Sequence, residues 1–132
     1  MPVSTSETPK SIGMKDAALF RQQVYINGKW LDADSGETTV ITNPSTGEVL
    51  GTVPNCGASE AKRAIEAANE AWPKWRSKTA KERAVIMRRW YELMMENQED
   101  LARLMTAEQG KPLTESRGEI SYAASFIEWF GE

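Results

Sequence analysis

The sequence contains no histidine and a single cysteine, Cys56, among its 132 residues. Histidine is the commonest general base near neutral pH, and together with cysteine it supplies most zinc ligands. These absences exclude a zinc site and a Ser-His-Asp triad within this sequence. One cysteine also excludes an intrachain disulfide, which suits a reducing compartment, and the expected location is the cytoplasm.

The sequence also lacks a strong charge bias and a long apolar run. Its formal net charge is −3, with basic and acidic residues interspersed, so no field attracts a polyanion and we expect no nucleic-acid partner. No stretch approaches the roughly 20 consecutive apolar residues that span a bilayer. The first ten residues have neither the basic start nor the apolar middle of a secretory signal, so we expect no membrane partner.

What is present is typical of a globular domain, with 40% hydrophobic and 27% charged residues. Residues 1–15 are rich in Ser, Thr, Pro and Lys without apolar periodicity, which predicts a mobile leader. Asp16 is then expected to cap a short helix that carries Ala18, Leu19 and Phe20.

Two β-hairpins are predicted next. Val24 and Ile26 alternate before Asn27-Gly28, and this pair is the strongest short hairpin signal because both turn residues must reach positive φ. A second pair of strands is expected at 38–42 and 48–53, on either side of the turn 43–47.

Helical periodicity follows from residue 59 onward. We expect a first helix with Ser59 as N-cap that is interrupted late by Pro73, and a second helix opened by the capping box Thr79 to Glu82. A third helix is expected over 100–108, ended by Gly110, and a fourth with Pro112 in its first turn, running toward Phe130. The core stripe expected for the second helix is Ile86, Trp90, Leu93 and Met94. Strands followed by helices indicate an α+β fragment.

The fourth predicted helix has two apolar stripes. The first contains Ile120, Ala123, Ala124 and Ile127, and the second contains Tyr122, Phe126 and Trp129. A surface helix needs one buried stripe, so this helix is expected to lie between two layers. The alternative is a small helical domain in which Gly131 ends the helix and the second stripe is an oligomer contact.

No residue of the sequence qualifies as catalytic from its surroundings. Cys56 precedes a helix, which lowers a thiol pKa, but it has no histidine partner. The segment 108–112 lacks the first glycine and the Ser or Thr of a phosphate-binding loop, so we interpret it as a structural turn. Glu115 and Glu119 share a helix face without a second acid pair, and we interpret them as surface charge.

Five short motifs, taken in order, resemble the N-terminal portion of the NAD(P)-dependent aldehyde dehydrogenases. Each motif is weakly specific alone, but their common order and spacing make the likeness strong from residue 16 to the end. Segments 101–112 and 121–130 are most similar to the bacterial succinate-semialdehyde dehydrogenases within that family. The motifs are Asn27-Gly28-Lys29-Trp30, Asn43-Pro44-Ser45-Thr46-Gly47-Glu48, Thr79-Ala80-Lys81-Glu82-Arg83, Glu108-Gln109-Gly110-Lys111-Pro112 and Gly118-Glu119-Ile120-Ser121-Tyr122-Ala123.

The resemblance implies a complete enzyme of the α/β class, the aldehyde dehydrogenase fold, with a Rossmann-like cofactor domain of which residues 16–132 are an incomplete N-terminal part. The implied reaction oxidises succinate semialdehyde, or a similar aldehyde, with NAD or NADP, in 4-aminobutyrate degradation. A cysteine thiolate attacks the carbonyl, hydride passes to the nicotinamide, and a glutamate-activated water hydrolyses the thioester. The implied partners are the rest of the dehydrogenase chain and further copies in a homo-oligomer.

The family's catalytic motifs Gly-Gln-x-Cys, Glu-Leu-Gly-Gly and Pro-Trp-Asn do not occur in this sequence. We therefore expect no catalytic or cofactor-binding residue here, no NAD(P) binding by this segment, and no activity by the segment alone. The resemblance places Tyr122 and Phe126 at the substrate entrance and a monovalent-cation site near Thr42 and Glu108, with ordinary packing as the alternative for both pairs. The alternative function is a small non-catalytic helical module that pairs through the second stripe of the fourth helix.

Overall fold

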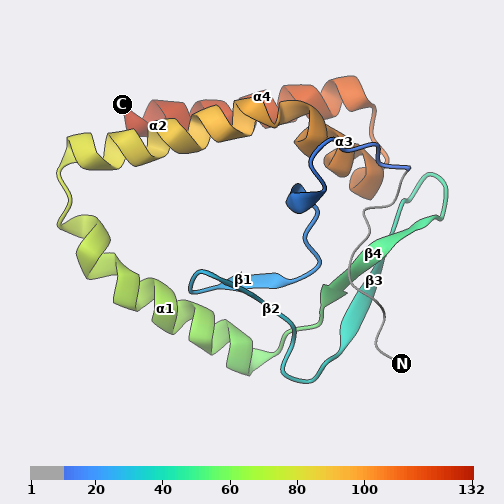
Figure 1. The fold of residues 1–132 in the computed structure, drawn as a ribbon, viewed down its shortest axis with the longest axis horizontal. Helices are drawn as coiled ribbons and strands as arrows, with labels where there is room; N and C mark the ends of the chain where they lie inside the picture. The colour runs from blue at the N-terminus through green and yellow to red at the C-terminus, as the bar shows by residue number, and fades with distance from the viewer. Residues whose placement is uncertain (1–10) are drawn as a thin grey trace.

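The computed structural model describes residues 11–132, and within them it has two β-hairpins followed by four α-helices (Figure 1). This order confirms the α+β class expected for the segment. Among these residues no helix is long and apolar enough to cross a membrane. The elements are the 3-10 helix η1 (Ala17–Leu19), β1 (Val24–Ile26), β2 (Lys29–Leu31), β3 (Thr38–Thr42), β4 (Val49–Pro54), α1 (Ala58–Arg76), α2 (Ala80–Glu96), α3 (Gln98–Gln109) and α4 (Leu113–Gly131).

Both predicted hairpins are confirmed. Strands β1 and β2 pair antiparallel with Ile26 opposite Lys29, and the two turn residues Asn27 and Gly28 have φ values of 49° and 77°. Those positive angles are what a two-residue turn matching the strand twist requires. Strands β3 and β4 also pair antiparallel, and an irregularity in their register lies between Ile41 and Thr42.

The start of α1 differs from the prediction. The N-cap is Gly57 rather than Ser59, because the Glu60 carboxylate at the third helical position accepts the Gly57 N–H at 2.9 Å. The helix also continues through Pro73 to Arg76. Pro73 lies in the last turn, so it leaves one carbonyl without its helical partner but does not end the helix.

The remaining helix boundaries lie close to those predicted. Thr79 caps α2, since its side chain accepts the Glu82 N–H at 3.3 Å and Glu82 accepts the Thr79 N–H at 2.7 Å. Helix α3 begins at Gln98, two residues before the predicted start, and ends at Gln109, followed by the C-cap Gly110, whose φ is 72°. Pro112 is the N-cap of α4 and so precedes the first turn in which it was expected.

The core lies between α3, the β3–β4 hairpin and the segment that precedes β1. Ile12, Leu50 and Ala107 are buried together, with Met14, Phe20, Ile41 and Leu104 packed around them. Residues 11–15, the end of the predicted leader, therefore pack against the core. Residues 1–10 lie outside the described residues, so for them the mobile leader stays a prediction.

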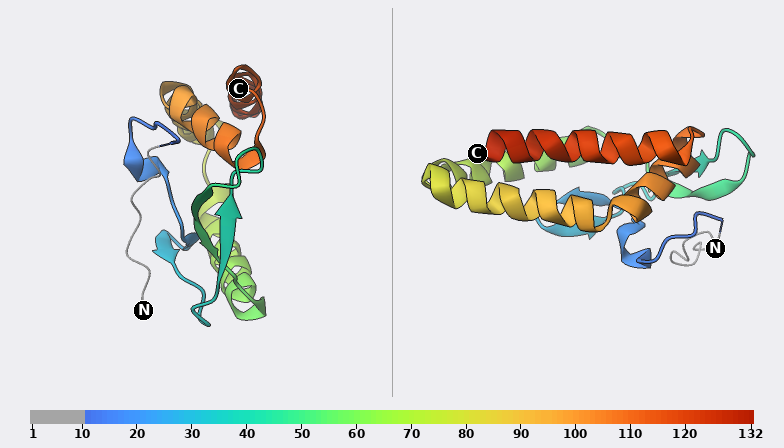
Figure 2. Two further views of the ribbon diagram at one scale, coloured as in Figure 1. Left: turned by 90° about the vertical axis from the view of Figure 1, so that its right-hand side faces the viewer. Right: turned by 90° about the horizontal axis from the view of Figure 1, so that it is seen from above.

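The helices form two arms of an open arc. Figure 1 shows α1 diverging from α2, and the view from above in Figure 2 shows α2 and α4 running side by side. Most of the stripe predicted to be core on α2 is not covered by the described residues, since Ile86, Trp90 and Leu93 are 44, 54 and 41% exposed and only Met94 is half-buried. On α1, Ile65 and Trp72 are likewise exposed. Both helices are amphipathic as predicted, but no described element covers these exposed apolar residues.

Candidate functional site

Helix α4 presents two chemically different faces. Its inner face packs on α2 and α3 and buries Ser116, Ile120 and Ala124, which are four residues apart and therefore lie on one side of a helix. The outer face of α4 consists of Tyr122, Phe126, Trp129 and Phe130, which are 47 to 76% exposed. Of the first predicted stripe, Ile120 and Ala124 are buried, Ile127 is half-buried and Ala123 is exposed, whereas the second stripe is exposed throughout.

Polar contacts between α3 and α4 fix the direction in which the outer face points. Arg117 donates to both Glu99 oxygens, at 2.7 and 3.0 Å, and this pairing lowers the pKa of Glu99. Gln98 donates to the Ser121 hydroxyl at 2.7 Å, and the Thr106 and Ser116 hydroxyls are 2.8 Å apart. A bidentate guanidinium–carboxylate pair is geometrically specific, so α4 has little freedom to rotate about its axis.

The structure brings together the two residues predicted at the substrate entrance. The rings of Tyr122 and Phe126 meet edge to face, with centroids 4.8 Å apart and planes at 80°. An open apolar pocket continues from Phe126 along the same helix to Trp129 and Phe130. This surface has the apolar, aromatic character of a small-molecule entrance. The role of the two residues toward a substrate stays a prediction.

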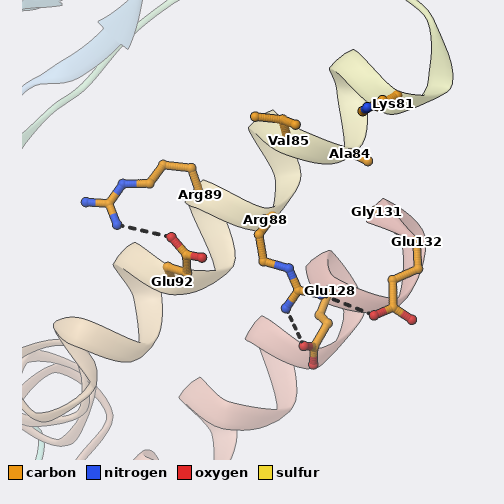
Figure 3. Close-up of a pocket in the computed structure, with 9 residues that line it drawn as sticks. All are labelled: Lys81, Ala84, Val85, Arg88, Arg89, Glu92, Glu128, Gly131 and Glu132. Carbon is orange, nitrogen blue, oxygen red and sulfur yellow. Dashed lines mark hydrogen bonds and ion pairs between the residues drawn. The ribbon is translucent and has the colours of Figure 1, made fainter.

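A second pocket, of about 580 Å³, lies between α2 and α4 (Figure 3). Arg88 donates to Glu128 at 2.7 Å and to Glu132 at 3.2 Å, and its pairing with Glu128 raises the pKa of the guanidinium. The lining contains three cationic side chains, Lys81, Arg88 and Arg89, and three acidic ones, Glu92, Glu128 and Glu132. With balanced charges this pocket offers little attraction to the phosphates of a dinucleotide.

The two residues predicted to lie near a monovalent cation, Thr42 and Glu108, are the last residue of β3 and a residue in the last turn of α3. Glu108 lies in a pocket of about 20 Å³ together with Ile41, the residue before Thr42. Both Thr42 and Glu108 are exposed. In the described part of the chain, no three Asp, Glu, Cys or His side chains gather to hold a metal ion. A monovalent cation bound by backbone oxygens stays a prediction.

The motif 108–112 is a helix-ending turn, as interpreted from the sequence. The N–H of Gly110 donates to the Thr106 carbonyl at 2.8 Å, and a Cβ at Gly110 would lie 2.7 Å from the Ser45 hydroxyl and 2.9 Å from a Pro44 ring carbon. Gly110 is therefore required both by its positive φ and by this close approach. Two of the recognised motifs touch at this point.

The other candidates occupy surface positions. Cys56 is an exposed free thiol before α1. Glu115 and Glu119 are both exposed, and Glu119 forms an ion pair with Lys111. None of these residues lies in the pockets described above.

A buried carboxylate at the start of α1 was missed by sequence reasoning. Glu60 is 4% exposed and accepts hydrogen bonds from the Asp34 N–H at 2.7 Å, the Gly57 N–H at 2.9 Å and the Ser59 hydroxyl at 2.8 Å. These donors, the Asp34 N–H foremost, lower the pKa of Glu60 to about 2. Its position three residues after Gly57 was the available signal.

A second buried carboxylate, Asp100, was also missed. It is 4% exposed and lies in the first turn of α3, where an acidic residue is ordinary and gives no sign of a distant partner. Its oxygens accept the N–H groups of Lys15 and Asp16, and these bonds lower the pKa of Asp100 below its usual range.

Several solved structures with the same arrangement of elements are named as dehydrogenases. Succinate-semialdehyde dehydrogenase from Burkholderia pseudomallei is similar to this chain with a TM-score of 0.88 and 61% identity, over 89% of this chain and 24% of that one. The hairpins and helices therefore have the arrangement found in a segment of an aldehyde dehydrogenase.

The model of the aldehyde dehydrogenase family matches residues 30–132. This chain belongs to the aldehyde dehydrogenase family. It is 70% identical to glutarate-semialdehyde dehydrogenase of Pseudomonas putida over 119 residues, which are 90% of this chain and 25% of that protein. It is 65% identical, with the same coverage, to the succinate-semialdehyde dehydrogenase (NADP(+)) GabD of Escherichia coli. The chain spans about a quarter of the length of these relatives.

Proposed function

We propose that this chain acts as the N-terminal part of a semialdehyde dehydrogenase. The reaction oxidises succinate semialdehyde, or a close relative such as glutarate semialdehyde, to the carboxylate with NAD or NADP. The observation that carries the proposal is the identity of 70% and 65% to dehydrogenases of these two substrates over 119 residues. A substrate pair that differs by one methylene suits a shared architecture. The setting proposed is the cytoplasm, in 4-aminobutyrate degradation.

The contribution of this chain to that reaction is structural. The outer face of α4 and the exposed stripes of α1 and α2 are apolar surfaces of the kind that pack against further protein. The proposed partners are the rest of a dehydrogenase chain and other copies in a homo-oligomer. The catalytic cysteine, the glutamate base and the NAD(P) contacts would come from that remainder, so the chain alone is expected to be inactive.

The proposed substrate entrance includes Tyr122 and Phe126. Their T-shaped contact and their exposure support a place on the wall of an apolar channel. In an active enzyme, Phe126→Ala is expected to raise KM for a semialdehyde with a smaller change in kcat, because the residue binds rather than reacts. Thr42 and Glu108 are proposed to lie near a monovalent cation, which activity titrated with K⁺ and Na⁺ would test.

A chimera tests the main proposal. The 132 residues replace the matching first quarter of the Pseudomonas putida relative, and the purified chimera is assayed with succinate and glutarate semialdehydes, each with NAD and with NADP. The expected result is turnover comparable to that of the relative, whereas the 132-residue chain shows none under the same conditions. The matched control is a chimera rebuilt with the relative's own first quarter and the same junction.

Two outcomes would contradict the proposal. The first is turnover by the 132-residue chain alone. The second is a folded chimera without activity when the rebuilt control is active. A chain that unfolds cooperatively by itself and forms a defined oligomer through the outer face of α4 would favour the non-catalytic helical module instead.

A further inference from the structure

Residues 15–23, called the strap below, follow the buried core residue Ile12 and lead from α3 along β4 to the first hairpin. Ile12 is 4% exposed and packs with Leu50 and Ala107. The strap makes a 3-10 turn at η1, where the Asp16 side chain accepts the Ala18 N–H at 2.9 Å. It then follows an extended path to β1 (Figure 1).

One end of the strap is attached through a single carboxylate. The Lys15 N–H donates to both oxygens of Asp100, at 2.9 and 3.1 Å, and the Asp16 N–H donates to one of them at 2.8 Å. Asp100 is only 4% exposed. Hydrogen bonds to an ionised acceptor are about twice as strong as neutral ones, and the partners are 84 and 85 residues apart in sequence.

The other end of the strap is attached to β4. The Gln22 side-chain oxygen accepts the Thr52 N–H at 2.7 Å, which is an outward-facing amide of the edge strand. A Cβ at Gly51 would meet the end of the Gln22 side chain and lie 3.2 Å from a Phe20 ring carbon, so both side chains pack closely against β4.

The strap forms one wall of the pocket that contains Glu108. Phe20 and Gln22 line it from the strap, and Leu50 and Thr52 line it from β4. Its volume of about 20 Å³ leaves space for little more than one water molecule. Without the strap, the Glu108 side of β4 would be open.

We propose that the strap is a releasable lid over the Glu108 pocket, held closed at one end by Asp100 and at the other by Gln22, and that it opens as a unit. This inference does not depend on the enzymatic proposal. Because the two attachments lie only seven residues apart on one segment, at Lys15 and Gln22, loss of either is expected to free the chain between them. A purely local role for Asp100 would leave the Gln22 end in place.

Hydrogen exchange of the wild-type chain tests this without any substitution. If the strap opens as a unit, the amides of Lys15, Asp16 and Thr52 report one common opening free energy. Amides of α2 and α4 serve as the folded reference. Where these reference amides exchange freely in the 132-residue chain, the measurement is made in the chimera. Clearly different opening free energies at the two ends would overturn the proposal.

Substitutions give a second test. Asp100→Asn removes the charge, so we expect the Thr52 amide to exchange about tenfold faster or more, and trypsin to cleave faster after Lys15 and Arg21. Gln22→Ala is expected to speed exchange of Lys15 in the same way. The control Glu92→Gln, an exposed acid on α2, should change neither end. Faster exchange at Lys15 with an unchanged Thr52 amide in Asp100→Asn would show a local contact and refute the lid.

Discussion

Trp129→Ala probes whether further protein covers the outer face of α4. Trp129 is 74% exposed in the described structure. A large aromatic side chain buries about 200 Å² when covered. In the chain alone, therefore, the Trp129 side chain buries only about 50 Å² of apolar surface. Losing that burial lowers the stability by about 1 kcal/mol. The other ~150 Å² contributes only where a partner surface covers it, and is then worth roughly 3–4 kcal/mol.

The assay is the opening free energy of the α4 amides, measured by hydrogen exchange in the chain and in the chimera. We expect Trp129→Ala to lower it by about 1 kcal/mol in the chain and by about 4–5 kcal/mol in the chimera. The matched control is Ile120→Ala on the inner face, which is 7% exposed and already covered by α2 and α3. Ile120→Ala should lower the opening free energy by about 2–5 kcal/mol in both the chain and the chimera.

An equal effect of Trp129→Ala in the two proteins would refute the reasoning. It would mean that no further surface covers the outer face, and that the exposed stripe is a free surface rather than half of an interface. If the outer face is covered, Trp129→Ala lowers the opening free energy more in the chimera than in the chain, whereas Ile120→Ala lowers it equally in both.

The remaining predictions concern residues of this chain and are measured in the chimera. Leu50→Ala should cost about 2–5 kcal/mol in urea unfolding, because it empties part of the main core. Thr79→Ala should cost about 1 kcal/mol by loss of the α2 cap, and Thr79→Ser should restore most of it. Glu60, with its pKa lowered to about 2 from an ordinary 4.5, stabilises the fold above pH 4.5 and loses this contribution as the pH falls toward 2. The difference in urea midpoint between wild type and Glu60→Gln should therefore shrink over that interval, and a constant difference would contradict the assignment.

Local chemistry accounts for most of what the sequence predicted correctly. The Asn27-Gly28 turn, the capping box at Thr79 and the stop at Gly110 each depend on residues within one turn of themselves. The errors also have local causes. Ser59 is a good N-cap residue, but Glu60 satisfies the Gly57 N–H, so the cap lies two residues earlier. Pro73 is tolerated because it lies in the last turn of α1.

Part of the candidate site also follows from local spacing, and part depends on the tertiary structure. The contact between Tyr122 and Phe126 follows from their i, i+4 spacing, so the sequence predicts it without a tertiary structure. The approach of Glu108 to Ile41 joins segments that are far apart along the chain, and no periodicity encodes it. Only the resemblance to the family predicts that the end of β3 and Glu108 lie close together.

The sequence by itself determined the order and type of the elements, the two-sided character of α4 and the family motifs, because these depend on spacing and on turn chemistry. Only the tertiary structure decided which apolar stripe of α4 is covered, and that Asp100 binds the backbone of Lys15 and Asp16. The physical reason is distance along the chain. A hydrogen bond between residues 85 positions apart exists only after the core has brought α3 and the strap together.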